Sequence, residues 1–426
     1  MWSAGVHPVR HLLSGARLAQ LAPMTTVLLA HASVDLYGSD LQLVETAVGC
    51  LDAGADVVVL LPSDGPLAER MRGVGARVET LDVPVLRKAH LTPRGIAALG
   101  ISTLRALAPM TRLIRRLGPD TVLVNTLTIP AWLVAARLAG VAPVCHVHEA
   151  EADVRWVVRV GLAAPLLLAR DVVVNSVAAR DVVVSAVPAL RQRTRVFYNG
   201  VPGPPAAPGP DAGAGGAAPS PVADGGAGPG SGSTHVVLVG RLSPRKGSDV
   251  ALEAVARLRR AGRDVRLTLC GSVFAGYEWF EDQLRARADE DDLAGAVELV
   301  GYADPWAWFA RADVVVVPSR VEPFGNVAVQ AMLAGRPVVA SRTQGLAEIV
   351  RDGETGLLVP PDDAVALAGA VAALVDDRAR ASALAEAGRR DAAERFGVQR
   401  YRAQMGRLLV VRRAVVRLAP VKRHPG

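Results

Sequence analysis

The sequence is poor in aromatic residues and in cysteine. Phe, Trp and Tyr make up 4% of its 426 residues, whereas apolar residues together make up 50%. The hydrophobic cores must therefore be built mainly from Val, Leu and Ala, which favours layers of helices and sheets. The three cysteines, Cys50, Cys145 and Cys270, are scattered without a CxxC spacing. This pattern argues against a disulfide framework and a zinc site, and it is typical of a reducing compartment.

Long apolar runs and basic stripes are missing too. No stretch approaches the ~18 uncharged apolar residues that a membrane-spanning helix needs, and the longest, 121–136, contains Asn125 and Pro130. The N-terminus lacks the apolar segment of a secretory signal. A net charge of +7 with few, dispersed aromatic rings favours phosphate-bearing ligands or an anionic membrane face over nucleic acid. We expect a cytoplasmic protein, with a peripheral contact at the inner membrane face as a further option.

A shift in composition divides the chain into two halves. Residues 201–233 are nearly all Gly, Ala, Pro and Ser, which predicts a flexible linker between a domain at 24–200 and a domain at 234–400. Residues 1–23 are either a flexible extension or the product of an upstream start. The basic tail, 401–426, has apolar residues at helical spacing, so it either packs across the domains or lies on a membrane surface.

Both halves repeat a strand-then-helix pattern. This pattern predicts two Rossmann-like, doubly wound α/β domains that face each other across a cleft, with ligands at the carboxyl ends of the strands. Short Val- and Leu-rich runs mark the expected strands at 25–30, 55–61, 121–125, 143–147, 171–175, 235–239, 265–270, 297–300, 313–318 and 337–341.

Polar residues follow two of the expected strands in the first half. Gly38 precedes a helix expected from Leu41, and Ser39 or Asp40 is placed to cap it, so the first backbone N–H groups predict a small anion or hydroxyl site. Ordinary turn chemistry explains the same glycine. At 146 and 148, two histidines at alternate strand positions face one side and compete for one role, which is orienting a sugar, packing or binding a metal.

A basic loop opens the second half. The segment Gly240-Arg241-Leu242-Ser243-Pro244-Arg245-Lys246 follows the first strand there. Cations at the carboxyl end of a first parallel strand are placed to bind an anion, so Arg241 and Lys246 predict a diphosphate site. The alternative is a solvated basic loop.

The third candidate region combines a carboxylate with a helix start. Glu322 lies on a loop after the strand that ends at Pro318, and a helix is expected from about Asn326. Gln330 would stand in the second turn, where its side chain leans toward the helix N-terminus and can share a ligand with Glu322. The carboxylate would accept hydrogen bonds from sugar hydroxyls and the amide would bond ribose. The alternative is a helix-dipole partner and nothing more.

Four segments resemble one known family. They are Gly-Arg-Leu-Ser-Pro-Arg-Lys-Gly at 240–247, Glu-Pro-Phe-Gly-Asn-Val-Ala-Val-Gln-Ala-Met at 322–332, Gly-Leu-Ala-Glu-Ile-Val at 345–350 and Gly-Glu-Thr-Gly-Leu-Leu-Val-Pro-Pro at 353–361. Together they are similar to the family-4 retaining glycosyltransferases of the GT-B fold, of the group 1 type. The resemblance reaches from residue 24 to about residue 396 and is strongest after residue 235.

The resemblance implies a role for each matching residue. Arg241 and Lys246 match the clamp on the donor's diphosphate, and Glu322 matches the Glu that contacts the transferred sugar. Gln330 stands where the family has a second Glu. His148, with His146 as the alternative, matches the histidine that contacts the donor sugar. The implied catalytic set is His148, Glu322, Arg241 and Lys246; the donor site adds Gly240, Phe324, Gly325, Asn326 and Gln330, and the acceptor side adds Gly38, Ser39 and His146.

The resemblance also implies a reaction. A hexose would pass from a nucleotide sugar, with UDP or GDP as the carrier, to a hydroxyl of a sugar, a lipid-linked sugar or a small molecule, with retention of configuration. The nucleotide sugar is a co-substrate, and neither a metal nor another cofactor is expected. Polysaccharide, glycolipid or glycoside synthesis is the implied setting.

Two other interpretations stay open. Gln330 motivates a nucleotide-sugar-binding protein that keeps the fold and has lost transfer. A different GT-B enzyme, such as a nucleotide-sugar epimerase or a sugar phosphorylase, would need extra acids in the cleft or a pyridoxal-binding lysine, and neither stands out in the sequence.

Overall fold

The computed structural model describes residues 25–86, 92–149, 154–205, 232–274 and 276–410. The predictions made for residues 1–23, for the interior of the linker at 206–231 and for the end of the tail at 411–426 lie outside this part of the chain.

The first domain is built on a sheet of seven parallel strands in the order β3-β2-β1-β4-β5-β6-β7. Because the order reverses between β1 and β4, the carboxyl ends of these two strands border a crevice where such sheets bind ligands. The strands are β1 (Thr26–Ala30), β2 (Asp56–Leu61), β3 (Arg77–Thr80), β4 (Thr121–Val124), β5 (Val144–Val147), β6 (Asp171–Val174) and β7 (Thr194–Val196).

Helices cover both faces of this sheet. On one face, β-strand side chains pack against α1, α2 and the C-terminal α14, and on the other they pack against α3, α4, α5 and α6. The helices of this domain are α1 (Gly38–Asp52), α2 (Pro66–Gly73), α3 (Pro93–Leu117), α4 (Ala131–Leu138), α5 (Trp156–Ala163) and α6 (Val177–Ala186). Side-chain caps fix two of these starts, since Thr92 accepts a hydrogen bond from the N–H of Gly95 and Ser176 accepts one from Ala179.

The second domain repeats the design with six parallel strands in the order β10-β9-β8-β11-β12-β13. Its strands are β8 (Thr234–Val239), β9 (Val265–Cys270), β10 (Val297–Gly301), β11 (Val314–Val317), β12 (Val338–Ser341) and β13 (Leu357–Val359). Its helices are the 3-10 turn η5 (Pro244–Lys246), α7 (Ser248–Arg260), α8 (Glu278–Ala288), α9 (Pro305–Arg311), α10 (Asn326–Leu333), α11 (Leu346–Ile349), α12 (Ala364–Asp376) and α13 (Arg378–Phe396). The predicted pair of Rossmann-like domains is confirmed.

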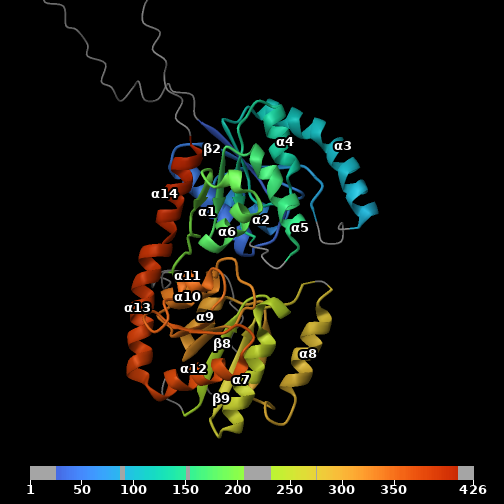
Figure 1. Cartoon of the computed structure of the whole chain (residues 1–426). Coiled ribbons are helices and arrows are strands. Elements are labelled where there is room, and N and C mark those ends of the chain that lie inside the picture. Colours follow the sequence, from blue (N-terminus) through green and yellow to red (C-terminus); the bar gives the residue numbers. More distant parts are fainter. Residues whose placement is uncertain (1–24, 87–91, 150–153, 206–231, 275, 411–426) are drawn as a thin grey trace, which may run out of the picture.

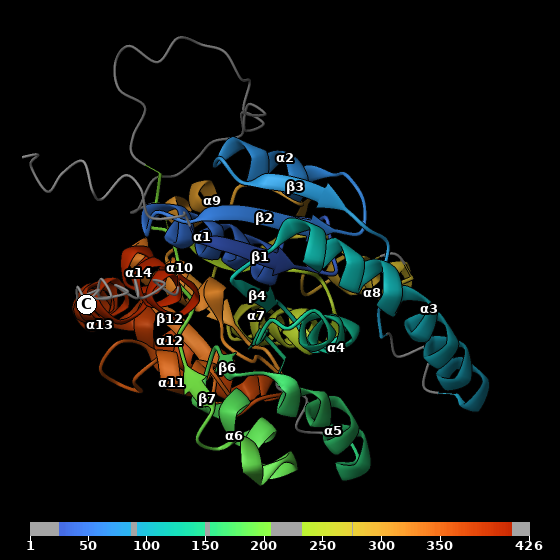
Figure 2. The ribbon, with the colours of Figure 1, turned by 90° about the horizontal axis from the view of Figure 1, so that it is seen from above.

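The end of the described chain returns to the first domain. Figure 1 shows α13 and α14 (Val398–Leu409) along one side of both domains, and Figure 2 places α3 on the opposite side. Helix α14 buries Tyr401, Met405 and Leu409 against α1. The predicted tail from residue 401 is therefore corrected, because the helix begins at Val398 and its described part is a packed element of the first domain.

The predicted linker also begins too early. Val201 is 4% exposed and belongs to the core of the second domain. Its N–H donates to the carbonyl oxygen of Phe396 at 2.9 Å. The chain therefore enters the second domain before the Gly- and Ala-rich segment starts. In the part of the chain that the structure describes, no helix is both long and apolar enough to cross a membrane.

Candidate active site in the interdomain cleft

Two loops of the second domain are held together at the carboxyl edge of its sheet. One runs from β8 through η5 to α7, and the other runs from β11 to α10. At Gly247, with φ of 69°, a Cβ atom would lie 2.1 Å from the carbonyl oxygen of Pro318, so only glycine allows this approach. Arg320 adds a bidentate contact to Asp249 at 2.9 and 2.7 Å and donates to the carbonyl oxygen of Pro244. The two loops thus form one rigid corner.

Lys246 and Glu322 meet in this corner. The Lys246 Nζ and Glu322 Oε2 atoms form an ion pair, and the hydroxyl of Ser319 donates to the same oxygen at 3.1 Å. The side chain of Glu322 is 12% exposed and that of Lys246 is 29% exposed. A cation and a carboxylate held at the edge of a cleft offer one group for a phosphate and one for hydroxyl groups.

Helix α10 begins beside this pair, at the predicted residue. Gly325 precedes it, and Phe324 is buried against the rings of Tyr198 and Phe396. Gln330 lies one turn further along, half-buried. The backbone N–H groups at a helix N-terminus attract negative charge, so the start of α10 adds to the field of Lys246.

The first domain touches α10 at Gly38. A Cβ atom on Gly38 would lie 3.1 Å from Nδ2 of Asn326, and Nδ2 of Asn199 donates to Oδ1 of Asn326 at 3.0 Å. Asn326 thus links Asn199, which lies between β7 and β8, to the start of α1 at Gly38. The structure therefore brings Gly38 and Asn326 together across the boundary between the domains.

Arg241 does not join Lys246 and Glu322. No hydrogen bond or ion pair links it to either residue within the described ranges. Its guanidinium carbon lies 3.7 Å from the ring centre of Tyr37, on the first domain, and 3.0 Å from that of Phe274, on the second. Burial lowers the pKa of Arg241, and the contact with Tyr37 opposes this shift. In this structure Arg241 bridges the two domains by stacking between rings.

The predicted cap of the first helix is wrong. Helix α1 begins at Gly38, with Tyr37 at the N-cap, rather than at Leu41. Ser39 is inside the first turn and caps nothing. The carboxylate of Asp40 accepts the N–H of Tyr37 at 2.8 Å and lies 2.6 Å from Nε2 of His31. Asp40 is 2% exposed, and one of its carboxylate oxygens is used by the N-cap residue of this helix. The anion or hydroxyl site expected at Gly38 stays a prediction.

His146 and His148 lie on one face of β5, with ring centres 4.0 Å apart. His146 is fully buried and stacks on the ring of Tyr401, whose centre is 6.2 Å away. Burial lowers the pKa of both histidines. His148 is less buried, and its Nε2 lies 3.0 Å from Oδ1 of Asn125. Of the two predicted histidines, His148 is thus the less buried one, and the ring of His146 packs against it.

Two residues beside His148, namely His31 and Asn125, escaped the sequence analysis although the sequence carries a signal for them. His31, Asn125 and the predicted His148 each stand directly after a strand, namely β1, β4 and β5. These strands are neighbours in the sheet, so their carboxyl ends meet at one edge. No comparable signal marks Tyr37 and Phe274, and the contact of Tyr37 with Arg241 depends on the docking of two domains.

Glu348 fastens the two domains at a second place. Its carboxylate, on α11, accepts the N–H groups of Val177 and Ala178, both at 2.8 Å, at the start of α6. The first N–H groups of a helix have no partner within the helix, so the carboxylate satisfies two of them. A negative charge is also stabilised at a helix N-terminus. Arg395 holds the same turn by donating to the carbonyl oxygen of Glu348 at 2.6 Å.

Replacing Glu348 by alanine should loosen the contact between the domains. Hydrogen bonds to a charged group contribute about 1.5–3 kcal/mol each, which corresponds to a tenfold or larger shift toward open forms. Small-angle scattering should show a larger radius of gyration for the variant without ligand. Glu354→Ala is the matched control, since the Glu354 side chain is 70% exposed and contacts Arg351. Identical scattering from wild type and Glu348→Ala would contradict the prediction.

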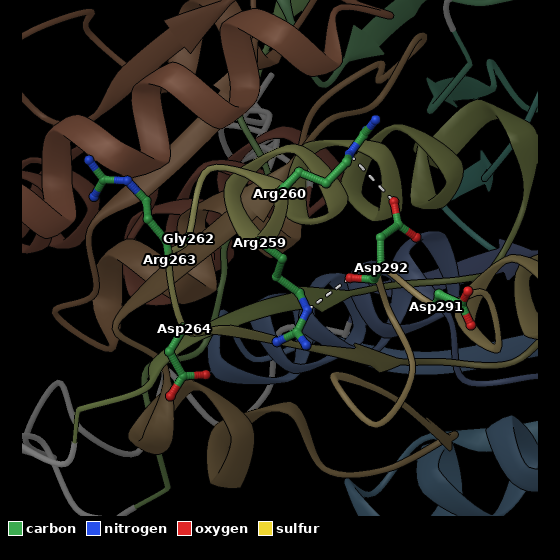
Figure 3. A pocket seen from close by; sticks show the side chains of 7 residues that line it. All are labelled: Arg259, Arg260, Gly262, Arg263, Asp264, Asp291 and Asp292. Atoms are coloured by element: carbon green, nitrogen blue, oxygen red, sulfur yellow. Dashed lines mark hydrogen bonds and ion pairs between the residues drawn. The ribbon is translucent and has the colours of Figure 1, made fainter.

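A surface hollow of the second domain lies away from this cleft (Figure 3). It precedes β9, at the amino edge of the sheet, whereas open parallel sheets bind ligands at the carboxyl edge. Arg259 donates to the carbonyl oxygen of Asp292 at 2.9 Å, and Arg260 pairs with the Asp292 carboxylate at 3.5 Å. The hollow is lined by Arg259, Arg260, Gly262, Arg263, Asp264, Asp291 and Asp292. Arg263 pairs with the carboxylate of Asp376, outside the hollow, at 2.6 Å. The three arginines of the hollow are thus already engaged, and we do not regard the hollow as the donor site.

No group of three or more His, Cys, Asp or Glu side chains within the described ranges is placed to hold a metal ion. The expectation of a metal-independent reaction stays a prediction.

The architecture defines the class. Two Rossmann-like domains whose sheets present their carboxyl edges to one cleft are the arrangement of GT-B proteins, and solved structures of that kind match along the chain. HepE of Anabaena, in complex with UDP and glucose, has a TM-score of 0.72 at 22% identity, over 90% of this chain and 98% of that chain. Sucrose-phosphate synthase of Thermosynechococcus elongatus has a TM-score of 0.66 at 21% identity, over 90% of this chain and 98% of that chain. These likenesses establish the fold.

The family follows from the sequence of both halves. The model described as Glycosyltransferase Family 4 matches residues 38–202, and the model described as Glycosyl transferases group 1 matches residues 233–377. The chain belongs to this family of glycosyltransferases.

Curated relatives match over a shorter stretch. A D-inositol 3-phosphate glycosyltransferase of Pseudarthrobacter chlorophenolicus is 41% identical over 150 residues, which is 35% of this chain and 36% of that protein. A glycogen synthase of Mycobacterium tuberculosis is 39% identical over 165 residues, which is 38% of this chain and 39% of that protein. The matches thus span little more than a third of these relatives' own length.

Proposed function

We propose that the protein transfers a hexose from a nucleotide sugar, with UDP or GDP as the carrier, to a hydroxyl group with retention of anomeric configuration and without a metal. The observation that carries the proposal is the corner where Lys246, Glu322 and the start of α10 meet, opposite Gly38 of the first domain. This corner offers positive charge for a phosphate and a carboxylate that accepts hydrogen bonds from hydroxyl groups. The first domain lies directly opposite both groups.

The donor would be held by exchanging partners in this corner. Lys246 is paired with Glu322, and a diphosphate would take over the ammonium group. The released carboxylate of Glu322 would then accept hydrogen bonds from hydroxyl groups of the sugar. Arg241 would reach the diphosphate after leaving its place between Tyr37 and Phe274. Gln330 would bond the ribose through its amide.

Bond breaking places negative charge on the departing diphosphate. Lys246 and the N-terminus of α10 would stabilise that charge as it develops, which lowers the barrier because these groups are already oriented. The acceptor hydroxyl would attack on the face from which the diphosphate leaves, and a phosphate oxygen would take its proton. Contacts between the domains at Asn326 and at Glu348 would keep water out during this step.

The acceptor and the cellular setting follow from the same proposal. The acceptor would lie against the first domain, on the side of Gly38 and Ser39, and would be a sugar, a lipid-linked sugar or a small molecule. Polysaccharide, glycolipid or glycoside synthesis, in the cytoplasm or at the inner membrane face, is the proposed setting.

A thermal-shift screen against UDP, GDP, ADP and their sugar conjugates tests the donor site. A ligand that binds only the folded state stabilises it by about 2.7 kcal/mol at a concentration of ~100 Kd, so one nucleotide class should raise the midpoint. UDP is tested first because a matched structure contains it. Product anomers assigned by NMR, with and without a chelator, then test retention and metal independence.

Gln330 motivates one alternative, a protein that binds the nucleotide sugar and does not transfer the sugar. It would show a thermal shift with a nucleotide sugar and no turnover, with either water or any hydroxyl acceptor. No shift with any nucleotide would contradict both functions.

A further inference from the structure

A line of hydrogen bonds runs through buried side chains from Asp40 to His148. Oδ1 of Asp40 lies 2.6 Å from Nε2 of His31, Nδ1 of His31 lies 3.2 Å from Nδ2 of Asn125, and Oδ1 of Asn125 lies 3.0 Å from Nε2 of His148. Asp40, His31 and Asn125 are 2%, 4% and 0% exposed. Buried polar groups that bond one another in series constrain each other's donor and acceptor roles.

The carboxylate fixes the role of the first ring. Asp40 accepts the N–H of Tyr37 with Oδ2 at 2.8 Å, so its other oxygen is the acceptor for His31. Nε2 of His31 therefore carries the proton. In a neutral imidazole the other nitrogen is then an acceptor, which makes Nδ1 of His31 the partner of an N–H donor.

The side-chain amide of Asn125 passes this order of donor and acceptor on to His148. Nδ2 of Asn125 faces two acceptors, Nδ1 of His31 and the carbonyl oxygen of Ser39 at 3.4 Å, which matches its two N–H groups. Rotating the amide would place its oxygen against the carbonyl oxygen of Ser39. Oδ1 of Asn125 consequently faces His148 and accepts from Nε2–H of that ring.

We propose that Asp40 sets the tautomer of His148 through His31 and Asn125, so that Nδ1 of His148 accepts a hydrogen bond from a hydroxyl of the transferred sugar. The part that concerns the sugar rests on the function proposed above. Asp40, His31 and Asn125 are then positioning residues, because they act on the sugar through another side chain.

The surroundings of His148 agree with a neutral ring. Burial lowers the pKa of His148 well below its usual value. The Glu149 carboxylate is turned to other partners, since it accepts the backbone N–H of His148 at 3.0 Å and the hydroxyl of Thr126. A neutral ring has one acceptor nitrogen, and the line of bonds decides which one it is.

The substitution Asp40→Asn should exchange the donor and acceptor roles in this line of hydrogen bonds. The N–H of Tyr37 still needs an acceptor, so the new amide turns its oxygen to Tyr37 and its N–H to Nε2 of His31. His31 then carries its proton on Nδ1. Asn125 rotates to accept that proton and gives up its weaker 3.4 Å hydrogen bond to the carbonyl oxygen of Ser39, so His148 receives an N–H donor at Nε2. The expected result is that His148 changes from the Nε2–H to the Nδ1–H tautomer, although the side chains of His31 and Asn125 separate it from the substituted residue.

NMR of the full chain labelled with ¹⁵N-histidine measures this change directly, because protonated and unprotonated ring nitrogens have separate chemical shifts. The chain has eight histidines, and comparison with His148→Gln identifies the signals of His148. Wild type should show Nε2–H and Asp40→Asn should show Nδ1–H. Asn125→Asp, which keeps an oxygen toward His148, should retain Nε2–H.

Kinetics give the second readout. In Asp40→Asn, kcat should fall about tenfold, the typical effect of one misdirected hydrogen bond, with little change in KM for the acceptor. Asp171→Asn is the control, because Asp171 is also buried in the first domain but pairs with Arg170 and Arg195 at the far edge of the sheet. It should lose stability and keep its kcat.

An Nδ1–H tautomer of His148 in wild type, or an unchanged spectrum in folded Asp40→Asn, would overturn the proposal. If Asp40→Asn does not fold, the spectra of wild type and Asn125→Asp decide, since a Nδ1–H tautomer in either contradicts the assigned polarity. The NMR readout needs no substrate, so it remains informative even if the protein transfers no sugar. If His148 shows the expected tautomers but the protein turns over no nucleotide sugar, the proposed hydrogen-bond order is supported and the proposed transfer function is contradicted.

Discussion

Replacing Lys246 by alanine is expected to lower kcat/KM for sugar transfer by about 10²–10³, the usual effect of removing one oriented group that stabilises charge in a transition state. The loss should be mainly in kcat, because the charge on the diphosphate grows as the bond to the sugar breaks. The thermal shift with the preferred nucleotide should shrink as well. Turnover of a defined acceptor and calorimetric binding of the nucleoside diphosphate measure the two effects.

The loop offers a matched control for this test, and the substitution itself should cost little stability. Arg245→Ala removes the cation next in sequence, whose side chain is exposed, and should change kcat/KM less than threefold by its effect on the general field. Removing Lys246 also leaves the carboxylate of Glu322 without its ion-pair partner. The stability cost should stay below the ~3–5 kcal/mol of a fully buried pair, since the Lys246 side chain is 29% exposed. Equal activities of Lys246→Ala and Arg245→Ala would contradict the proposed role of Lys246.

The strands that the sequence predicts are those with continuous apolar runs. The run Val314–Val317 is four valines, all buried, and a buried strand needs no other signal. The strands β3, β7 and β13 were not predicted. All three are edge strands of three or four residues. In β3 and β7 polar and apolar residues are mixed, and β13 is a run of only three apolar residues, which is too short to mark a strand.

The candidate site was predictable where its residues follow neighbouring strands of one sheet. Lys246 and Glu322 follow β8 and β11, which are neighbours in the sheet, and the structure brings the two side chains together. The position of Arg241 depends instead on Tyr37 of the other domain. Local sequence does not encode how two domains dock, so the stacking of the Arg241 guanidinium on Tyr37 could not be predicted from the sequence.

The start of α1 shows a different limit. Asp40 has the right residue type for a cap, and sequence patterns place caps within about two residues. Here the carboxylate is used at the third helical position, because His31 lies under it and needs an acceptor. A tertiary contact between β1 and α1 thus decided a boundary that local preference left open.

Tyr401→Ala should be the most destabilising single change in the described part of α14. Tyr401 is 1% exposed, its ring lies under that of His146, and its hydroxyl donates to Thr46 of α1 at 2.7 Å, since the Thr46 hydroxyl donates to Gln42. Truncating a buried aromatic residue costs about 3–5 kcal/mol. Denaturant unfolding of the first domain measures the loss, and hydrogen exchange of the α1 amides locates it.

Tyr401→Phe separates packing from the hydroxyl group. It keeps the ring under His146 and removes one hydrogen bond, so its cost should be about 0.5–1.5 kcal/mol. Because His146 supports His148, with ring centres 4.0 Å apart, the alanine variant should also lower kcat in the protein that remains folded, whereas the phenylalanine variant should not. Loss of exchange protection in α1 without a change in kcat would show that α14 stabilises the first domain without positioning His148.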